Sequence, residues 1–342
     1  MKNLKDVNIL ITGGLGFIGF NLVLKLLDKV KSIIIFDNLS SKSSKKNFYL
    51  FKKLITQKNI IFYKENILNI NKFKTKLNAD IIIHLAADLN QMKGEKNLER
   101  IIRNNTIGTL KVLNLASYLK IPLIFASTCK VYSNWINEIP IIEKETRYIW
   151  KNKILGISEK FPIEKNLSPR GAYGLSKYLS EEICKEYFCK YKIPIIINRL
   201  SGIYGKYQWG TKGYGWIWHF IESVKKNKQI NIYGTGKQVR DILFVDDLVN
   251  LLKKQILALL NNKLRFEIYN VGGGPQNTVS VLEVINILSK ISGKQVKIKF
   301  LPERYADLKI YISDIKKVSR DFNWHPKIKP ARGIKVVYNG VL

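Results

Sequence analysis

The stretch T-G-G-L-G-F-I-G at residues 12–19 decides the fold of this chain. It follows an apolar run at 7–11 and opens an apolar-periodic stretch at 20–27. A glycine-rich turn between a strand and a helix lets the backbone approach a pyrophosphate, and the helix N-terminus supplies free N–H groups for its oxygens. The glycine spacing is slightly wider at its start than the dinucleotide-binding fingerprint: Gly13, Gly16 and Gly19. By itself this stretch fits an ordinary tight turn about equally well.

A second apolar run strengthens the nucleotide interpretation. Residues 32–36 are followed directly by Asp37. This acid lies 18 residues after Gly19, close to the offset of about 20 expected for a ribose-binding acid. A carboxylate at this place accepts hydrogen bonds from a ribose 2′-hydroxyl and repels a 2′-phosphate. The pattern therefore predicts a dinucleotide site that prefers NAD to NADP.

Short apolar strands alternate with helical stretches over residues 1–200. The expected strands are 7–11, 32–36, 60–63, 80–84, 122–126 and 193–198, and the expected helices lie near 17–29, 45–57, 97–119 and 173–191. This alternation predicts an α/β fold with a doubly wound parallel sheet and right-handed crossovers. The strands are apolar throughout, as expected when both faces of a sheet are covered.

The amino-acid composition of the sequence changes after Arg199. Residues 201–236 are rich in glycine and aromatic side chains, which fit either ordinary packing or the walls of a site for a base and a sugar. Further elements are expected as a helix at 240–260, a strand at 266–271 and a helix at 278–292.

These patterns divide the chain into two parts. We expect residues 1–200 to form the nucleotide-binding domain, completed by about 237–271. Residues 201–236 and 272–342 are expected to form a smaller C-terminal α/β substrate lobe. Ligands of open α/β sheets lie at the carboxyl ends of the strands, so the cleft between the two parts is the expected site.

Composition bounds the class of protein. The 342 residues are 46% hydrophobic and 11% aromatic, which is typical of an ordered globular protein with a substantial core. No apolar run approaches the ~18 residues of a membrane span, and the N-terminus lacks a secretory apolar region. Neither the cysteines nor the histidines show a spacing typical of a disulfide framework or a metal site. We therefore expect a cytoplasmic protein without a membrane partner or a bound metal.

The formal net charge of +32 allows two interpretations. A basic surface is the electrostatic footprint of nucleic-acid binding. However, the lysines are spread along the whole chain, with one dense patch at 42–53, and no nucleic-acid-binding motif accompanies them. A general lysine-rich composition is the favoured interpretation, and the charge would still attract a dianionic substrate. We expect no nucleic-acid partner.

Three side chains carry the candidate chemistry. Thr128 follows the strand at 122–126, and a predicted helix places Tyr173 and Lys177 four residues apart on one face. Free tyrosine, with a pKa of about 10, is a poor base at neutral pH unless a nearby ammonium and a cationic nicotinamide favour the phenolate. Together with the glycine-rich turn and Asp37, these three residues form a highly specific sequence signature.

These motifs together resemble the extended short-chain dehydrogenase/reductase family over essentially the whole chain. The resemblance implies a Rossmann-type fold, bound NAD and a nucleotide-sugar substrate. It also implies that Tyr173 is the general acid/base, that Lys177 tunes it and holds the nicotinamide ribose, and that Thr128 binds the reacting oxygen. The residues that it places at the cofactor are Gly13, Gly16, Phe17, Ile18, Gly19, Asp37, Asn38, Asn66, Ile67, Leu85, Ala86, Ala87, Asn105, Tyr173 and Lys177.

Several segments resemble one branch of this family, the CDP-paratose 2-epimerases. They are S-T-C-K-V-Y at 127–132, G-Y-G-W-I-W-H-F at 213–220, G-K-Q-V-R-D at 236–241 and W-H-P-K at 324–327. The likeness implies that Arg240 and Arg304 bind a diphosphate through the fork geometry and permanent charge of the guanidinium group. The implied substrate contacts are Thr128, Lys130, Asn198, Arg240 and Arg304.

The residues after Thr128 favour one reaction within the family. Dehydratases of the family have an acidic pair there that expels water, whereas this chain has Cys129 and Lys130. An epimerase needs only to oxidise the sugar, let the keto-sugar turn over and reduce it from the other face. The resemblance also implies a homodimer or a dimer of dimers, with the helices near 97–119 and 173–191 packed as a four-helix bundle.

Other functions stay open at this point. The chain departs from the family pattern at two positions. It has Cys129 where this branch has asparagine, and Asn66 where the family usually has an aspartate that binds the adenine amine. A UDP-hexose 4-epimerase would use the same fold and cofactor. A dehydrogenase would release its cofactor in each cycle. A non-catalytic binder of nucleotides or nucleic acid would not need Thr128, Tyr173 and Lys177 to be intact.

Overall fold

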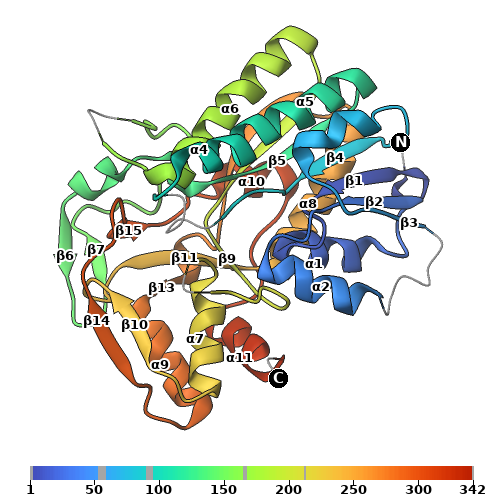
Figure 1. Ribbon diagram of the computed structural model, residues 1–342. Coiled ribbons are helices and arrows are strands. Elements are labelled where there is room, and N and C mark those ends of the chain that lie inside the picture. The colour runs from blue at the N-terminus through green and yellow to red at the C-terminus, as the bar shows by residue number, and fades with distance from the viewer. Residues whose placement is uncertain (1–2, 53–58, 90–94, 165–167, 212, 341–342) are drawn as a thin grey trace.

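The computed structural model describes residues 3–52, 59–89, 95–164, 168–211 and 213–340, and it is built around a twisted parallel sheet (Figure 1). Among the described residues this sheet has seven strands: β1 (Asn8–Thr12), β2 (Ser32–Phe36), β3 (Ile60–Tyr63), β4 (Ile81–His84), β5 (Leu123–Thr128), β8 (Ile195–Leu200) and β12 (Phe266–Val271). Their order is β3-β2-β1-β4-β5-β8-β12, and all neighbours are parallel. The predicted doubly wound α/β fold is confirmed.

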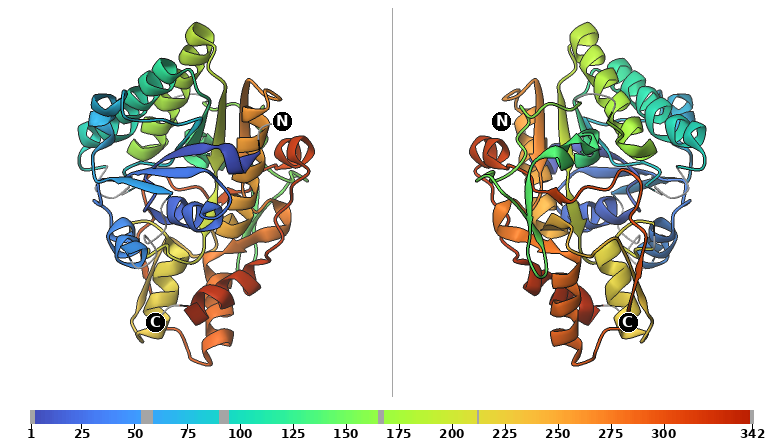
Figure 2. Two further views of the ribbon diagram at one scale, coloured as in Figure 1. Left: turned by 90° about the vertical axis from the view of Figure 1, so that its right-hand side faces the viewer. Right: turned by 90° about the vertical axis from the view of Figure 1, so that its left-hand side faces the viewer.

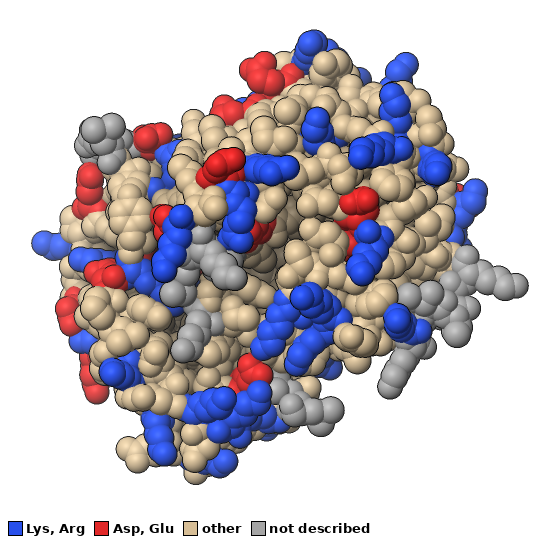
Figure 3. All heavy atoms as spheres, in the orientation of Figure 1, with Lys and Arg blue, Asp and Glu red and all other residues tan. Residues whose placement is uncertain are grey.

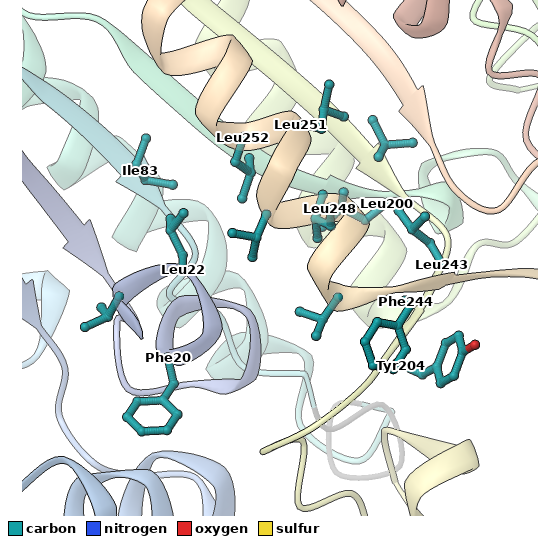
Figure 4. Close-up of a cluster of buried hydrophobic side chains, with 14 of the residues drawn as sticks. Phe20, Leu22, Ile83, Leu200, Tyr204, Leu243, Phe244, Leu248, Leu251 and Leu252 are labelled. Atoms are coloured by element: carbon teal, nitrogen blue, oxygen red, sulfur yellow. The ribbon is translucent and has the colours of Figure 1, made fainter. Parts of the chain in front are cut away.

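Helices cover both faces of the sheet (Figure 2). They include α1 (Phe17–Leu26), α2 (Lys42–Lys52), α4 (Leu98–Ile101), α5 (Gly108–Leu119), α6 (Gly171–Tyr191) and α8 (Val245–Leu260). Because side chains alternate along a strand, Ile9 and Ile11 pack in the same core cluster as α1 and α8, whereas Leu10 packs in that of α5 and α6. In Figure 4, α8 lies between Leu22 of α1 and Phe244. Burial on both faces explains why the central strands β1, β4 and β8 are so apolar.

The C-terminal part forms smaller sheets beside the carboxyl ends of the main sheet (Figure 1). Its strands are β9 (Gly202–Tyr204), β10 (Ile230–Tyr233), β11 (Val239–Phe244), β13 (Thr278–Ser280), β14 (Ile298–Leu301) and β15 (Ile310–Tyr311). Its helices are α7 (Trp216–Lys225), α9 (Val281–Ser292), α10 (Lys316–Phe322) and α11 (Pro330–Gly340). β11 pairs with β9, β13 and β15, and β10 pairs with β14. A hairpin, β6 (Ile141–Glu143) and β7 (Tyr148–Trp150), lies at the edge. The exact division into two domains stays a prediction.

Two helices begin later than predicted. The helix expected from residue 240 begins at Val245, because Val239–Phe244 is a buried strand with partners on both sides. Asp246 and Asp247 fill the first turn of α8, where acidic side chains are stabilised by the helix dipole. The helix expected from residue 278 begins at Val281, after strand β13. Ser280 and Glu283 form its capping box.

The predicted helix at 97–119 is interrupted rather than continuous. A π-helical turn, Ile102–Ile107, separates α4 from α5. Such turns are rare in proteins, and those that occur often lie at functional sites. The predicted helix at 45–57 corresponds to α2, which begins at Lys42, and residues 53–57 lie outside the described part. Over that described part, no helix combines the length and the apolar composition that crossing a membrane requires.

Candidate active site

A cavity of about 840 Å³ lies between the main sheet and the C-terminal part. Figure 3 shows this face hollowed near its middle, with lysine and arginine side chains on several sides of the hollow. The cavity wall contains the residues after β1, β2, β4 and β5 together with residues from 200–220 and 231–240. In the sheet, β1 lies between β2 and β4, so successive connections leave from this point in opposite directions, where α/β proteins bind ligands.

The glycine-rich turn forms a close-fitting cradle at one end of the cavity. Gly13 has φ of 69°, and a Cβ atom added there would lie 2.7 Å from the backbone nitrogen of Ala86. Gly16 is the N-cap of α1 and makes no side-chain cap, so the first N–H groups of that helix remain available. A Cβ atom on Gly19 would collide with the carbonyl oxygen of Gly13. The turn thus fits a pyrophosphate, and all three glycines line the cavity with Phe17 and Ile18.

Asp37 closes β2 beside this cradle and lines the cavity. Its carboxylate accepts hydrogen bonds from the backbone N–H groups of Leu15, at 3.1 Å, and Leu39, at 2.8 Å. Burial raises its pKa above the ordinary value, while these hydrogen bonds act in the opposite direction. Asp37 therefore both orders the glycine-rich turn and presents an acidic edge to a ribose.

The other predicted cofactor residues meet along the same wall, with one exception. Asn38, Asn66, Ile67, Leu85, Ala86 and Ala87 all line the cavity. Asn66 uses its side-chain oxygen to cap the following turn, where it accepts from the Leu68 N–H at 3.0 Å. Asn105 does not line the cavity. Its buried amide holds both backbone groups of Asp88, at 2.7 and 3.1 Å, and the Ser176 hydroxyl, at 3.0 Å. It therefore shapes the wall from behind, at the π-helical turn.

The three candidate catalytic residues line the middle of the cavity. Thr128 ends β5, and Tyr173 and Lys177 lie in the first two turns of α6. Tyr173 and Thr128 form a side-chain hydrogen bond. Lys177 is 2% exposed and donates from Nζ to the carbonyl oxygen of Ala126 at 2.8 Å. The structure therefore brings the predicted set together.

A glycine that the sequence analysis did not single out allows this approach. A Cβ atom on Gly174 would collide with the carbonyl oxygen of Lys130. The missing side chain lets the first turns of α6 lie directly against the segment that follows Thr128. The dipeptide Tyr173-Gly174 was the available signal, because a glycine inside a helix usually has a packing reason.

A buried ion pair beneath Lys177 was also missed. Glu181 and Arg199 are 2.7 Å apart, with side chains 0% and 3% exposed. The Ser127 hydroxyl donates to Glu181, and Arg199 also donates to the Tyr132 hydroxyl at 2.9 Å. This network ties the ends of β5 and β8 to α6. The spacing of Tyr173, Lys177 and Glu181 at every fourth residue was its signal.

Burial acts on the ionisable groups of the site in a consistent way. It raises the pKa of the Tyr173 phenol, although the hydrogen bond with Thr128 lowers it. It lowers the pKa of Lys177 to about 7, against the effect of Glu181, and raises the pKa of the Cys129 thiol to about 11. In each case a dry environment disfavours the charged form.

The other end of the cavity is basic. Lys130, Arg240 and Arg304 line it together with one carboxylate, Asp307. Arg240 pairs with Asp307 at 2.7 Å, and the Arg304 guanidinium lies 4.0 Å from the centre of the Tyr233 ring. Burial lowers the pKa of Lys130; although burial also favours a neutral Asp307, the pKa of that acid is held below its ordinary value by Arg240 and Lys130. Three basic groups against one acid leave positive charge for a diphosphate.

One predicted substrate contact lies elsewhere. Asn198 is 1% exposed and exchanges two hydrogen bonds with Gln255 of α8, at 2.7 and 2.8 Å. Both sides of its amide are used inside the core between β8 and α8. The structure therefore places Asn198 away from the cavity wall, and the interpretation of this residue as a substrate contact is corrected.

Known proteins share this architecture along the whole chain. The NAD dependent epimerase/dehydratase family matches residues 9–272. A CDP-paratose 2-epimerase of Salmonella typhi is 31% identical, over 97% of this chain and 98% of that protein. A putative UDP-glucose 4-epimerase of Methanocaldococcus jannaschii is also 31% identical, over 97% of each. The crystal structure of UDP-glucuronic acid 4-epimerase from Bacillus cereus, in complex with UDP-glucuronic acid and NAD, is 27% identical with a TM-score of 0.78, over 97% of this chain and 98% of that one.

The site geometry supports the same family as these matches. The glycine-rich cradle, Asp37 after β2 and the pair Tyr173 and Lys177 all line one cavity. The chain therefore belongs to the NAD-dependent epimerase/dehydratase family, and its cofactor is NAD.

Proposed function

We propose that this chain is a nucleotide-sugar epimerase that inverts C2 of a CDP-linked 3,6-dideoxyhexose such as CDP-paratose, which yields CDP-tyvelose. The observation that carries the proposal is that Thr128, Tyr173 and Lys177 line one cavity, between the nucleotide cradle and the basic end. A sugar bound there has its diphosphate at Arg240 and Arg304, which leaves the sugar ring at Tyr173. NAD supplies the two-electron acceptor at this place.

The residues of the chain divide the work between proton transfer and binding. Tyr173 takes the hydroxyl proton of the sugar and later gives it back, with Thr128 bonded to the same oxygen. Lys177, held by Ala126, lies on the same face of α6 and supplies positive charge when protonated. Dry surroundings strengthen each of these interactions.

The residues after Thr128 support epimerisation over dehydration. Both line the cavity, and neither carries a carboxyl group. Burial raises the pKa of Cys129 to about 11, so its thiol is neutral at physiological pH. Elimination of water needs a group that removes a carbon-bound proton and another that protonates the leaving hydroxyl. Cys129 and Lys130 are poorly suited to this pair of tasks.

The choice of CDP-paratose is supported by the similarity to the Salmonella typhi enzyme. A second candidate, a UDP-hexose 4-epimerase, has the support of a putative UDP-glucose 4-epimerase at the same identity. The experiment is incubation of the purified protein with CDP-paratose, UDP-glucose and UDP-glucuronic acid, followed by proton NMR of the products. Conversion of CDP-paratose alone supports the first candidate, and conversion of UDP-glucose but not CDP-paratose overturns it.

Two further results would move the function outside epimerisation. Net formation of free NADH during turnover would indicate a dehydrogenase. Tight, salt-sensitive binding to DNA without turnover of any sugar nucleotide would indicate a nucleic-acid binder.

We also propose that the protein forms a homodimer through α5 and α6. These helices pack on each other and expose Tyr118 and Tyr191, which are 53% and 44% accessible. Two such helices from each subunit would build a four-helix bundle. Light scattering on the purified protein tests this assembly, and a monomeric mass at micromolar concentration would contradict it.

A further inference from the structure

One segment from the C-terminal part crosses the cavity and lies on the nucleotide-binding helices. This bridging segment, residues 206–211, connects β9 towards α7. Its backbone is held by three side chains of α1 and α2: Asn21 donates to Lys206 O at 2.9 Å, Asn47 donates to Tyr207 O at 3.3 Å, and Ser43 donates to Gln208 O.

Asn47 is the centre of these contacts. It is 0% exposed, and its Nδ2 donates to the carbonyl oxygen of Leu15, inside the glycine-rich turn, at 3.0 Å. Its Oδ1 accepts from the indole Nε1 of Trp209 at 2.6 Å. A single buried amide therefore joins the turn that cradles the pyrophosphate to a segment about 160 residues later in the chain.

Aromatic and cationic contacts reinforce the same junction. The Tyr207 ring packs edge-on against Phe20 of α1 at 5.1 Å between centroids. Trp209 lies between Lys46, 4.3 Å from its ring, and Trp218 of α7, at 5.0 Å. Tyr207 and Trp209 both have positive φ, 65° and 47°. Such backbone conformations persist only where the surroundings fix them, and they are concentrated at ligand clamps.

Residues of the bridging segment also line the cavity. Gln208 and Thr211 do so together with Ser43 and Ser44 of α2, and the Tyr214 hydroxyl forms a hydrogen bond with Ser43. The side of the cavity next to Asp37, where the adenosine half of a dinucleotide belongs, is therefore covered by residues that Asn47 holds in place.

We propose that the bridging segment is a latch that retains NAD, and that Asn47 is the positioning residue that fastens it through Trp209 and Leu15. Opening the latch requires the hydrogen bond between Asn47 and Trp209 to break, so NAD dissociates slowly. The proposal rests on NAD binding alone and not on the identity of the sugar. Slow release suits a reaction that must return both electrons to the sugar from which they came.

The test measures how fast NAD leaves the loaded protein, with no sugar nucleotide present. NAD-loaded wild type, Trp209→Phe and Asn47→Ala are mixed with excess fluorescent etheno-NAD, and exchange is followed over time. We expect Trp209→Phe to speed dissociation about tenfold, the scale of one lost buried hydrogen bond. Asn47→Ala also loses the bonds to Leu15 and Tyr207, so it should speed dissociation at least as much. The double variant should be no faster than the faster single variant, because both changes break the same bond.

Trp324→Phe is the matched control. Trp324 is also buried, at 4% exposure, and its indole donates to the carbonyl oxygen of Asp247 at 2.9 Å, away from the cavity wall. It should dissociate NAD at the wild-type rate. A wild-type dissociation rate in Trp209→Phe, or an equal acceleration in Trp324→Phe, overturns the proposal. If Asn47→Ala does not fold, Trp209→Phe decides alone.

Discussion

Tyr173 and Lys177 face the same cavity, and burial opposes the charged form of both. It raises the pKa of the Tyr173 phenol and lowers that of Lys177 to about 7. In the protein without cofactor, the phenol is therefore protonated at neutral pH, whereas Lys177 is divided between its charged and neutral forms. Positive charge brought by bound NAD favours the phenolate. We therefore expect the proposed base, Tyr173, to become active when NAD is bound.

Replacement of Tyr173 tests the role of this phenol. Tyr173→Phe removes the acid/base group but keeps the ring, so turnover should fall by about 10²-fold or more, the usual scale of general acid–base catalysis. NAD should still bind, because the cradle and Asp37 are untouched. Steady-state kinetics and NAD titration check both parts. Turnover near the wild-type rate would refute the assignment.

Lys177 should leave a signature in the pH dependence of stability. Its pKa is about 7 when folded and about 10.4 in an unfolded chain, so between these values the unfolded chain binds more protons. The free energy of unfolding must then rise with pH across this window. From pH 7 to pH 9 the cofactor-free wild type should gain about 2 kcal/mol more than Lys177→Met, as measured by urea unfolding. Equal pH slopes would contradict the shifted pKa.

Asp37 should choose between the two dinucleotides by its charge. Asp37→Asn keeps one oxygen that can accept from Leu15, but its NH2 group replaces the oxygen that accepts from Leu39, so one hydrogen bond is lost together with the negative charge. We expect binding of NADP to improve relative to NAD, because a 2′-phosphate is no longer repelled. Calorimetric titration with both dinucleotides measures the ratio. An unchanged preference would mean that another group reads the ribose.

At the scale of elements, local patterns carried most of the prediction. Strands 32–36 and 60–63 match the structure at both ends. The first is buried, as a continuous apolar run in a parallel sheet predicts, whereas the second is an edge strand and only partly buried. The π-helical turn was not predictable in this way, because it depends on Asn105 reaching Asp88 and Ser176. Residues 240–244 were assigned to a helix, and only the partners β9, β13 and β15 make them part of a strand. Asn198 was misplaced because its partner Gln255 is remote in sequence.

The junction of β1 and α1 should tolerate no side chain at Gly19. Gly19→Ala drives a Cβ atom into the backbone of Gly13 and Gly14, which cannot move without distorting the cradle. We expect a loss of about 1–3 kcal/mol in stability, as for other overpacked sites, together with weaker NAD binding. Gly340→Ala is the control, since nothing lies within 4 Å of that position. Thermal unfolding of both variants, with and without NAD, measures the difference, and equal behaviour would argue against the close approach.

At the scale of the whole molecule, the site exists only because remote parts of the chain meet. The tyrosine and lysine, the glycine-rich turn and Asp37 could be grouped from the sequence, because their spacing is local. The latch at Asn47 and Trp209 could not, and neither could Asp307, which joins the predicted contacts Lys130 and Arg240. Their partners lie up to about 180 residues apart, and no periodicity of the sequence records such a contact.

The net charge of +32 should act on the rate at which substrate arrives. A dianionic sugar nucleotide is attracted by this field, and the Debye length shortens from about 30 Å at 0.01 M salt to about 8 Å at 0.15 M. The association rate constant of CDP should therefore fall severalfold over this range in stopped-flow measurements. Cytidine is the uncharged control, and its association should hardly change with salt. If CDP behaves like cytidine, the lysines reflect composition alone, and the basic end of the cavity acts only on contact.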